Sequence, residues 1–385
     1  MSCRINENNQ SKLLAYRREL HENPELAFQE YETTKRIRRW LEEGEITILD
    51  YPLETGLVAE VRGEQEGPTI ALRADIDALP ILEQSGVSFS SKNEGVMHAC
   101  GHDFHTSSII GATLLLQSRR SELKGTVRII FQPAEEIAQG AAYVAERGVL
   151  EGVSAIFGMH NKPELPVGTI GVRSGALMAS VDRFELDIIG AGGHAGIPND
   201  VIDPIVIASQ IVTAFQSIVS RNLSPFHNAV VSVTKLQSGN TWNVIPEKAE
   251  LEGTVRTFQE ETREMIGERM RALAEGIAES YGARAEFRWY SYLPVVNNDE
   301  RFTEIAAEAA KVAGYKAVPA EQIPAGEDFA FYQTKIPGYF VWMGVDGPNA
   351  WHHPAFKLNE AALEVAANYF TELAILVLEN SWIYK

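Results

Sequence analysis

Residues 96–105 of this 385-residue chain read Val96-Met97-His98-Ala99-Cys100-Gly101-His102-Asp103-Phe104-His105. The stretch holds three histidines, one cysteine and one aspartate in ten positions. Thiolate and imidazole groups, with a carboxylate nearby, are ligands that borderline-soft divalent metals prefer. Gly101 lets the backbone bend sharply, so Cys100 and His102 can both point inward. Two donors this close together cannot complete a metal site, so further ligands must come from elsewhere in the chain.

An apolar run over residues 104–116 follows this stretch and predicts a helix, so the candidate ligands lie where a loop enters a helix. Short apolar runs with the pattern of buried strands occur at residues 68–72, 126–131, 154–159 and 339–343. Further helices are predicted at residues 9–21, 30–43 and 138–147. The alternation of strands and helices predicts an α/β fold, with a mostly parallel sheet and helices on both faces.

Polar residues mark the carboxyl ends of the predicted strands. They are Asp75 and Asp77, then Glu135 and Glu136, then His160, and finally His352 and His353. In sheets of this kind, ligands bind beyond the carboxyl ends of the strands. We therefore expect these side chains to converge on one edge of one sheet, and this convergence is stronger support than any single motif.

The pattern changes between residues 179 and 292. Four predicted strands and two predicted helices follow one another there in the order β-α-β-β-α-β, which is typical of a ferredoxin-like domain. The sequence therefore predicts a compact second domain, residues 179–292, inserted into a first domain made of residues 1–178 and 293–385.

Composition excludes several classes of function. The net charge of −18 argues against binding to nucleic acids or anionic membrane surfaces, which requires basic patches. The chain has two cysteines, Cys3 and Cys100, so a disulfide framework is not expected and a reducing compartment fits. We find no apolar run long enough for a membrane helix and no signal peptide, and expect a soluble, cytoplasmic protein.

The candidate metal ligands number five. They are Cys100, His102, Glu136, His160 and His352. One catalytic zinc takes about three protein ligands, so five are better suited to two metals about 3.5–4 Å apart that activate a water molecule. A carboxylate must then take a proton from that water and deliver it to the leaving group. Glu135 is the candidate, because it neighbours Glu136 and can face the water while Glu136 binds metal.

Each residue also has an interpretation without catalysis. A pair of adjacent glutamates is usually solvated surface, and a histidine near a buried strand is more often a hydrogen-bonded core residue. Asp75 and Asp77 can orient ligating histidines or cap a turn. His98 and His105 are expected to be structural rather than ligands, and His21 is expected to make local helix contacts.

Seven motifs together resemble one known family over nearly the whole chain. They lie at residues 17–26, 73–80, 97–103, 132–136, 158–160, 326–329 and 351–354. The family is the amidohydrolase branch of the co-catalytic metallopeptidases, which includes aminoacylase, glutamate carboxypeptidase and succinyl-diaminopimelate desuccinylase. The chain most resembles the branch of hippurate hydrolases, auxin-conjugate hydrolases, and deacetylases of N-acetylcysteine and N-acetyldiaminopimelate.

The resemblance implies a role for each candidate residue of the first domain. Cys100 bridges two metals, the other four candidate ligands complete their coordination, and Glu135 acts as the general acid and base. Where the chain has two adjacent histidines, the resemblance favours His352 over His353, because relatives show a single histidine before a small residue and proline.

The resemblance also implies a role for the inserted domain as a lid that pairs two subunits in a homodimer. His194, in a glycine-rich turn, reaches the partner's active site and stabilises the oxyanion. Asn243 and Arg256 match substrate-binding positions, and the guanidinium of Arg256 suits the free carboxylate of an N-acyl amino acid.

The predicted function is hydrolysis of an N-acyl amino acid by two divalent metals, with zinc, manganese, cobalt and nickel all compatible with the ligands. One alternative is a dipeptidase or carboxypeptidase that uses the same metals. Another is a catalytically inactive binding protein on the same fold. A third makes Cys100 a nucleophile with His102 as its base, but it leaves Glu136, His160 and His352 unexplained.

Overall fold

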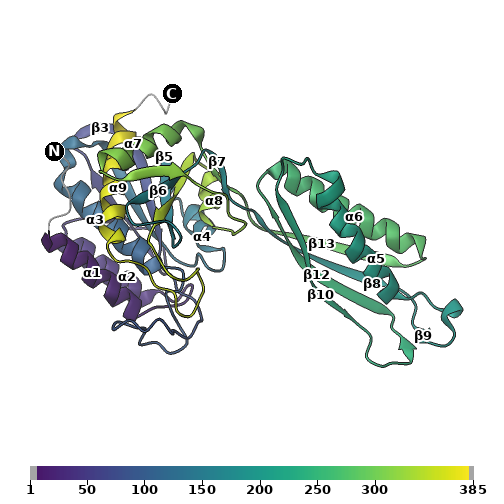
Figure 1. The fold of residues 1–385 in the computed structure, drawn as a ribbon. Coiled ribbons are helices and arrows are strands. Elements are labelled where there is room, and N and C mark those ends of the chain that lie inside the picture. The colour runs from purple at the N-terminus through teal and green to yellow at the C-terminus, as the bar shows by residue number, and fades with distance from the viewer. Residues whose placement is uncertain (1–6, 381–385) are drawn as a thin grey trace. The chain divides into compact units, whose positions relative to one another are not determined.

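The computed structural model describes residues 7–380, so Cys3 lies outside the described residues. The chain divides into two compact units, whose elements are labelled in Figure 1. The first comprises the described parts of Met1–Leu177, Asn297–Glu321 and Asp328–Lys385. The second comprises Met178–Val296 and Gln322–Glu327. Residues 322–327 therefore belong to the second unit, although they lie far from the predicted inserted domain in sequence.

The first unit is built on an eight-stranded sheet with the strand order β1-β2-β4-β3-β5-β16-β6-β15. The strands are β1 Thr47–Leu49, β2 Leu57–Arg62, β3 Gln65–Asp75, β4 Lys124–Gln132, β5 Val153–Lys162, β6 Thr169–Val172, β15 Lys316–Pro319 and β16 Gly338–Gly344. β3 pairs in parallel with both β4 and β5, β5 with β16, and β6 with β15. The antiparallel pairs are β1 with β2, β2 with β4, and β6 with β16. The predicted, mainly parallel sheet is confirmed.

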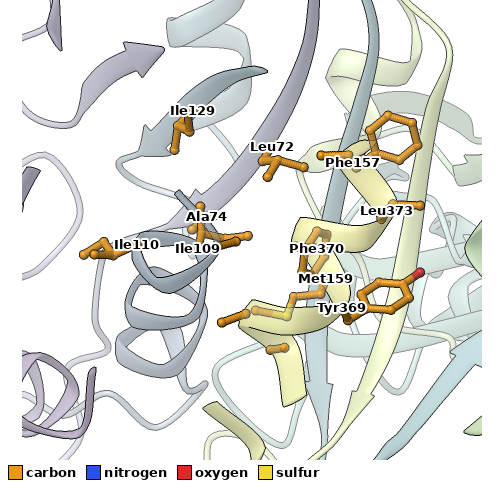
Figure 2. Close-up of a cluster of buried hydrophobic side chains, with 14 of the residues drawn as sticks. Leu72, Ala74, Ile109, Ile110, Ile129, Phe157, Met159, Tyr369, Phe370 and Leu373 are labelled. Carbon is orange, nitrogen blue, oxygen red and sulfur yellow. The ribbon is translucent and has the colours of Figure 1, made fainter. Parts of the chain in front are cut away.

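Helices cover both faces of this sheet. They are α1 Glu7–Glu22, α2 Tyr31–Glu43, α3 His102–Ser118, α4 Gly140–Glu146, α7 Thr303–Val312, α8 Phe329–Gln333 and α9 Ala362–Glu379. Successive side chains of β5 point to opposite faces of the sheet. Phe157 and Met159 point into the core formed with α3 and α9, where Figure 2 shows Met159 beside Phe370. Gly158 points the other way, where an added Cβ would come within 3.0 Å of the ring of Phe329 in α8.

The parallel register brings the carboxyl ends of neighbouring strands together. Asp75, the last residue of β3, pairs with Gln132, the last residue of β4. The sequence places His160 after the end of its strand, whereas β5 continues to Lys162. The reason is pairing with β16, which places Trp342 opposite His160 and extends the strand beyond the apolar run.

The second unit has a four-stranded antiparallel sheet with the order β10-β12-β8-β13, flanked by two long helices. The elements are β8 Val181–Ile189, α5 Pro204–Ser217, β10 Ala229–Ser238, β12 Lys248–Thr257, α6 Glu260–Ser280 and β13 Arg284–Leu293. This order is that of a ferredoxin-like fold, as predicted. Alternate residues of β8 (Phe184, Leu186 and Ile188) are fully buried in the core that α5 and α6 cover.

The remaining elements are short. Two two-stranded sheets pair β9 Gly193–His194 with β11 Val244–Ile245, and β7 Gly175–Met178 with β14 Val296–Asn298. Single turns of 3-10 or π helix occur at η1 Arg120–Glu122, η2 Pro198–Asp200, η3 Ile218–Asn222 and η4 Glu300–Phe302. None of the helices in residues 7–380 combines the length and apolar character that crossing a membrane requires.

His21 makes long-range contacts, so the prediction of local helix contacts is wrong. Its Nδ1 lies 2.9 Å from Asp103 Oδ2, and its Nε2 lies 3.1 Å from Glu83 Oε1. Arg17 Nε lies 3.1 Å from the same Asp103 oxygen. The buried Asp103 carboxylate requires partners, and tertiary packing supplies them from α1. This cluster fixes the first turn of α3 beside Cys100 and His102.

We expect this cluster to make stability depend on pH. Burial lowers the pKa of His21, but the charge of Asp103 and hydrogen bonds to Asp103 and Glu83 outweigh it and raise the pKa from 6.5 to about 9. Because the pKa is higher in the folded state, the stabilisation is complete below about pH 6.5 and is lost as pH rises through about 9. A shift of this size corresponds to about 3 kcal/mol. Urea unfolding of wild type and His21→Gln across this range should show a difference in the free energy of unfolding that narrows as pH rises.

His227→Gln provides a control, because His227 lies in the second unit, where its Nδ1 is 3.2 Å from Thr262 Oγ1. This variant should keep the pH dependence of the wild type. Parallel stability curves for wild type and His21→Gln would contradict the expectation.

Candidate functional site

Five side chains converge at the carboxyl edge of β3, β4 and β5 in two overlapping groups. One group is Cys100, His102 and His160, and the other is Cys100, Glu136 and His352. Within each group, one potential ligand atom per residue lies within 4.8 Å of the others. Cys100 belongs to both groups, a position suited to bridging two ions.

Local structure explains the position of Cys100 and His102. Gly101, between them, is the N-cap of α3 and has a φ of 82°. A Cβ here would lie 2.6 Å from Asn161 Nδ2, so the position favours glycine on both conformational and steric grounds. The sharp turn places both neighbouring side chains against β5.

The ring of His160 is held with one nitrogen directed at Cys100. Its Nδ1 donates a hydrogen bond to the Asn161 carbonyl at 2.9 Å, which leaves Nε2 unprotonated in the neutral ring. Nε2 lies 3.3 Å from Cys100 Sγ. Burial holds the pKa of His160 well below its usual value. His160 is therefore a neutral imidazole with a lone pair directed into the site, as a metal ligand must be.

The ring of His102 is oriented by Asp77. Its Nδ1 donates to the Asp77 carbonyl at 2.9 Å and lies 3.2 Å from Asp77 Oδ1. Asp77 Oδ2 accepts a hydrogen bond from the backbone N–H of Glu136 at 3.0 Å. Asp77 thus holds both residues, the arrangement in which an outer carboxylate fixes a ligating histidine.

Two buried atoms at the centre of the site test whether metals fit. His102 Nε2 and Glu136 Oε1 lie 3.7 Å apart, and in the described part of the chain neither has a hydrogen-bond partner. Buried polar atoms without partners are costly, and a divalent cation would satisfy both. The donor set of thiolate, imidazole and carboxylate matches zinc and related ions.

The charges of the site also favour cations. Burial lowers the pKa of His102, but Asp75, Asp77 and Glu136 outweigh it and raise the pKa to about 10. Burial raises the pKa of Glu136 to about 7 against the opposing charge of His102. The carboxylates therefore retain a proton on His102 in the metal-free protein, and a cation bound here would take the place of that proton.

A second layer of contacts fixes Asp75. Its Oδ1 accepts a hydrogen bond from His105 Nδ1 at 2.7 Å, and its Oδ2 pairs with Arg73 Nη1 at 2.8 Å. The backbone N–H of Asn161 donates to His105 Nε2 at 2.9 Å. Both ring nitrogens of His105 are thus engaged with residues outside the two groups that contain Cys100, which gives it a supporting position.

Sequence reasoning did not single out Asn161 and Trp351. Asn161 Nδ2 donates to the Cys100 carbonyl at 2.6 Å, and Trp351 Nε1 donates to the Asn161 carbonyl at 3.1 Å. The ring of Trp351 also lies edge-on to His160, with centroids 4.5 Å apart. The sequence signal that could have identified Asn161 and Trp351 is that each is next to a candidate ligand.

Glu135 lies beside the candidate ligands without belonging to the groups that contain Cys100. A carboxylate oxygen of Glu135 lies within 4.8 Å of ligand atoms of His102 and Glu136. Its Oε1 accepts a hydrogen bond from the backbone N–H of Asp328 at 3.2 Å. The Asp328 side chain is itself buried and held by Arg73 Nη2 at 2.7 Å. Glu135 is therefore a carboxylate placed at the edge of the site on a fixed support.

The two adjacent histidines near the C-terminus differ in position. His352 Nε2 lies 3.6 Å from Glu136 Oε2. His353 Nδ1 instead accepts a hydrogen bond from the backbone N–H of Ala355 at 3.0 Å. His352 has a φ of 63°, and its N–H is bonded to the Ala99 carbonyl at 2.9 Å. This tie to the loop before Cys100 places His352, rather than His353, in the ligand group.

The other three candidate residues lie in the second unit. His194 in β9 pairs with Val244 in β11, next to Asn243. The backbone N–H of Gly196 donates to His194 Nδ1 at 3.0 Å, so the neutral ring carries its proton on Nε2 and can donate from its exposed end. Arg256 is half-buried in β12, and its Nη1 donates to the Val255 carbonyl at 3.0 Å.

These three residues occupy opposite ends of the second unit. The turn with His194 follows Ile189, which pairs with Lys248 at the start of β12. Arg256 is near the end of β12. At about 3.3 Å per residue, the strand separates the two ends by about 25 Å, whereas an N-acetyl amino acid spans about 7 Å. One copy of this unit therefore cannot bring His194 and Arg256 to the same substrate molecule.

Comparison with known proteins is consistent with this geometry. Residues 71–375 match Peptidase family M20/M25/M40. The chain is 66% identical over 371 residues to an N-acetylcysteine deacetylase of Bacillus subtilis, covering 96% of this chain and 98% of that protein. It is 46% identical over 372 residues to an N-acetyl-L-cysteine deacetylase of the same organism, covering 97% of this chain and 89% of that protein. A Bacillus subtilis crystal structure described as a dinuclear metal binding peptidase superposes with a TM-score of 0.90 at 61% identity, covering 97% and 99%.

Metal analysis of two matched variants tests the ligand assignment. We expect His352→Ala to lose about one of two bound ions per chain, because it removes one of a small set of protein ligands. His353→Ala should keep both ions, because its ring nitrogen bonds to the backbone. Mass spectrometry of metal content after purification and dialysis measures the difference. Equal losses in both variants, or loss only in His353→Ala, would contradict the assignment.

Proposed function

The chain belongs to Peptidase family M20/M25/M40, and from this membership and the geometry of the site we propose that it hydrolyses the amide bond of N-acyl amino acids. The products are a carboxylate and a free amino acid. The observation that carries the proposal is the convergence of five metal-binding side chains and Glu135 on one sheet edge. The names of the most similar relatives make N-acetyl-L-cysteine the first substrate to test.

Two divalent ions fit the ligand groups, and Cys100, which belongs to both, is proposed to bridge them. When bound, such a pair polarises the amide carbonyl and lowers the pKa of a water molecule toward about 7. His102, Glu136, His160 and His352 are proposed to complete the coordination. We propose zinc, manganese, cobalt or nickel, because thiolate and imidazole ligands suit these ions.

Glu135 is proposed to carry the proton. It takes a proton from the attacking water as the oxygen adds to the amide carbon, and it delivers that proton to nitrogen as the C–N bond breaks. The hydrogen bond from the Asp328 backbone N–H to Glu135 Oε1 holds the carboxylate in position for this task. The amine therefore leaves as a neutral group. Without this proton it would have to leave as a strongly basic nitrogen anion, which is a poor leaving group.

The second unit is proposed to bind the substrate and its oxyanion. His194 Nε2–H donates to the oxygen that becomes negative as water adds, a task that requires the tautomer set by Gly196. Asn243 lies beside it on the paired strand. Arg256 is proposed to pair with the free carboxylate of the amino acid. Burial lowers the pKa of its guanidinium, and the charge of Asp182 opposes this shift. The same burial strengthens the attraction between the guanidinium and a carboxylate.

The distance between His194 and Arg256 within one unit supports a homodimer. If both groups act on one substrate molecule, one of them must come from a second copy of the chain. We propose that residues 179–292 act as a lid and dimerisation domain, and that His194 acts in the partner's site. A cytoplasmic location is part of the proposal, since the Cys100 thiol must stay reduced to bind metal.

The direct test measures release of free amino acid from N-acetyl-L-cysteine, other N-acetyl and N-benzoyl amino acids, and dipeptides. We expect the N-acyl amino acids to be cleaved, cleavage to stop after chelation, and divalent metal to restore it. Glu135→Gln should lower kcat by about 10³-fold or more with about two ions still bound. Faster cleavage of dipeptides would favour the dipeptidase alternative. Metal binding without any cleavage would favour an inactive binding protein, and loss of metal from Glu135→Gln would make Glu135 a ligand.

Mixed dimers test whether His194 acts on the partner's site. His194→Ala and Glu135→Gln should each be inactive alone. If His194 acts across the interface, a dimer with one subunit of each kind contains one intact site, so random mixing restores about a quarter of wild-type activity. If His194 acts within its own subunit, no site is intact and mixing restores nothing. A continuous assay of the two co-expressed variants, without separation of the dimers, distinguishes these outcomes.

A further inference from the structure

Glu30 is a buried carboxyl group that the proposed reaction does not use. It is 0% exposed and lies immediately before Tyr31, the first residue of α2. Its Oε1 accepts a hydrogen bond from the backbone N–H of Ala134 at 2.9 Å. Ala134 precedes Glu135, so the side chain of Glu30 contacts the chain one residue before the proposed proton carrier.

Ala134 has an unusual backbone conformation. Its φ is 54°, in the left-handed region that residues with a side chain rarely adopt, and the residue is fully buried. β4 ends at Gln132, so Ala134 forms the bend between the strand and Glu135. A buried N–H requires a hydrogen-bond partner, and Glu30 supplies it where the conformation is least favourable.

Other contacts hold the same bend from the opposite side. The Ala134 carbonyl accepts a hydrogen bond from Gly140 N–H at 3.1 Å. The backbone N–H of Glu136 donates to Asp77 Oδ2 at 3.0 Å. The direction in which the side chain of Glu135 leaves the backbone therefore depends on how Ala134 is held.

The position of Glu30 is itself fixed by α2. The Glu30 carbonyl accepts hydrogen bonds from Thr34 N–H at 2.9 Å and Thr34 Oγ1 at 2.6 Å. Thr34 Oγ1 accepts a further bond from Gly56 N–H at 2.8 Å. Buried Trp40 and Leu41 anchor the helix in the core. A carboxyl group on this support can maintain a strained backbone conformation elsewhere in the chain.

We propose that Glu30 is a positioning residue for the reaction: its carboxyl group holds Ala134 in the left-handed conformation and thereby directs Glu135 toward the metal-binding residues. The inference rests on the proposed role of Glu135 as proton carrier. Small displacements of a reacting group reduce rates strongly, which is why a residue without contact to the substrate can affect kcat.

Glutamine is a close substitute for Glu30. Burial, and after it the charge of Asp77, raise the pKa of Glu30 to about 7, so the protein already tolerates a neutral group at this position. The amide oxygen of glutamine can accept the same hydrogen bond from Ala134. Glu30→Gln should therefore behave like wild type, while Glu30→Ala leaves the Ala134 N–H without its acceptor.

Kinetics and metal content of the purified metal-loaded enzyme give the first measurement, with N-acetyl-L-cysteine as substrate. We expect Glu30→Ala to lower kcat by about tenfold or more, with KM within about twofold and about two ions still bound. Adding Ala134→Gly to Glu30→Ala should restore most of the lost kcat, because glycine adopts positive φ without steric cost. Glu32→Gln is the matched control, since Glu32 is exposed and pairs with Lys35.

Hydrogen exchange of the metal-free protein gives a measurement that does not depend on activity. Peptides covering residues 133–139 should exchange faster in Glu30→Ala than in wild type, Glu30→Gln or Glu32→Gln. The rest of the first unit should keep its protection, since a purely structural defect would raise exchange throughout.

The proposal is overturned if Glu30→Ala keeps wild-type kcat, if its activity falls only in proportion to lost metal, or if Ala134→Gly does not restore it. Unchanged exchange over residues 133–139 would also overturn it. A wild type that cleaves no N-acyl amino acid would instead reject the proposed function, and the exchange measurement would still decide whether Glu30 holds the bend.

Discussion

Burial of carboxylates is the constraint on which the rest of this site depends. A carboxylate removed from water must be paired, hydrogen-bonded or bound to a metal. Arg73 serves two of these groups, Asp75 and Asp328, and lies beneath the site with only 1% of its side chain exposed. The inner group, Glu136, faces the imidazole of His102 and has a buried oxygen without a hydrogen-bond partner among residues 7–380. Arg73 thus neutralises the two outer carboxylates, while the inner carboxylate of Glu136 is suited to a divalent ion.

The same constraint explains why the support around the ligands is extensive. Asp77 holds His102 and the backbone of Glu136, and Asn161 holds the carbonyl of Cys100. Each contact fixes a donor atom before a metal binds. This lowers the entropy lost on binding and restricts the positions that the donor atoms can take. The parallel register of β3, β4 and β5 makes this possible, because it brings separate stretches of chain to one edge.

Much of the architecture was predictable because it depends on local periodicity. Hydrophobic patterning predicts the β-α-β-β-α-β order over residues 179–292, and the structure has this order in the second unit. Contacts between distant residues were not predictable in the same way. His21 looks like a helix residue in sequence but lies 2.9 Å from Asp103, 82 positions away. Glu30 precedes an amphipathic helix, and nothing local indicates that its carboxyl group contacts Ala134.

The sequence by itself determined the fold class, the ferredoxin-like order of the second unit and the chemical type of the candidate metal ligands. These follow from hydrophobic periods and from side-chain chemistry, which are local properties. Only the tertiary structure decided which of His352 and His353 faces Glu136, which nitrogen of His160 and His194 carries the proton, and what supports Glu135. Those features depend on hydrogen bonds between segments far apart in the chain, and such bonds exist only once packing has fixed the distances between them.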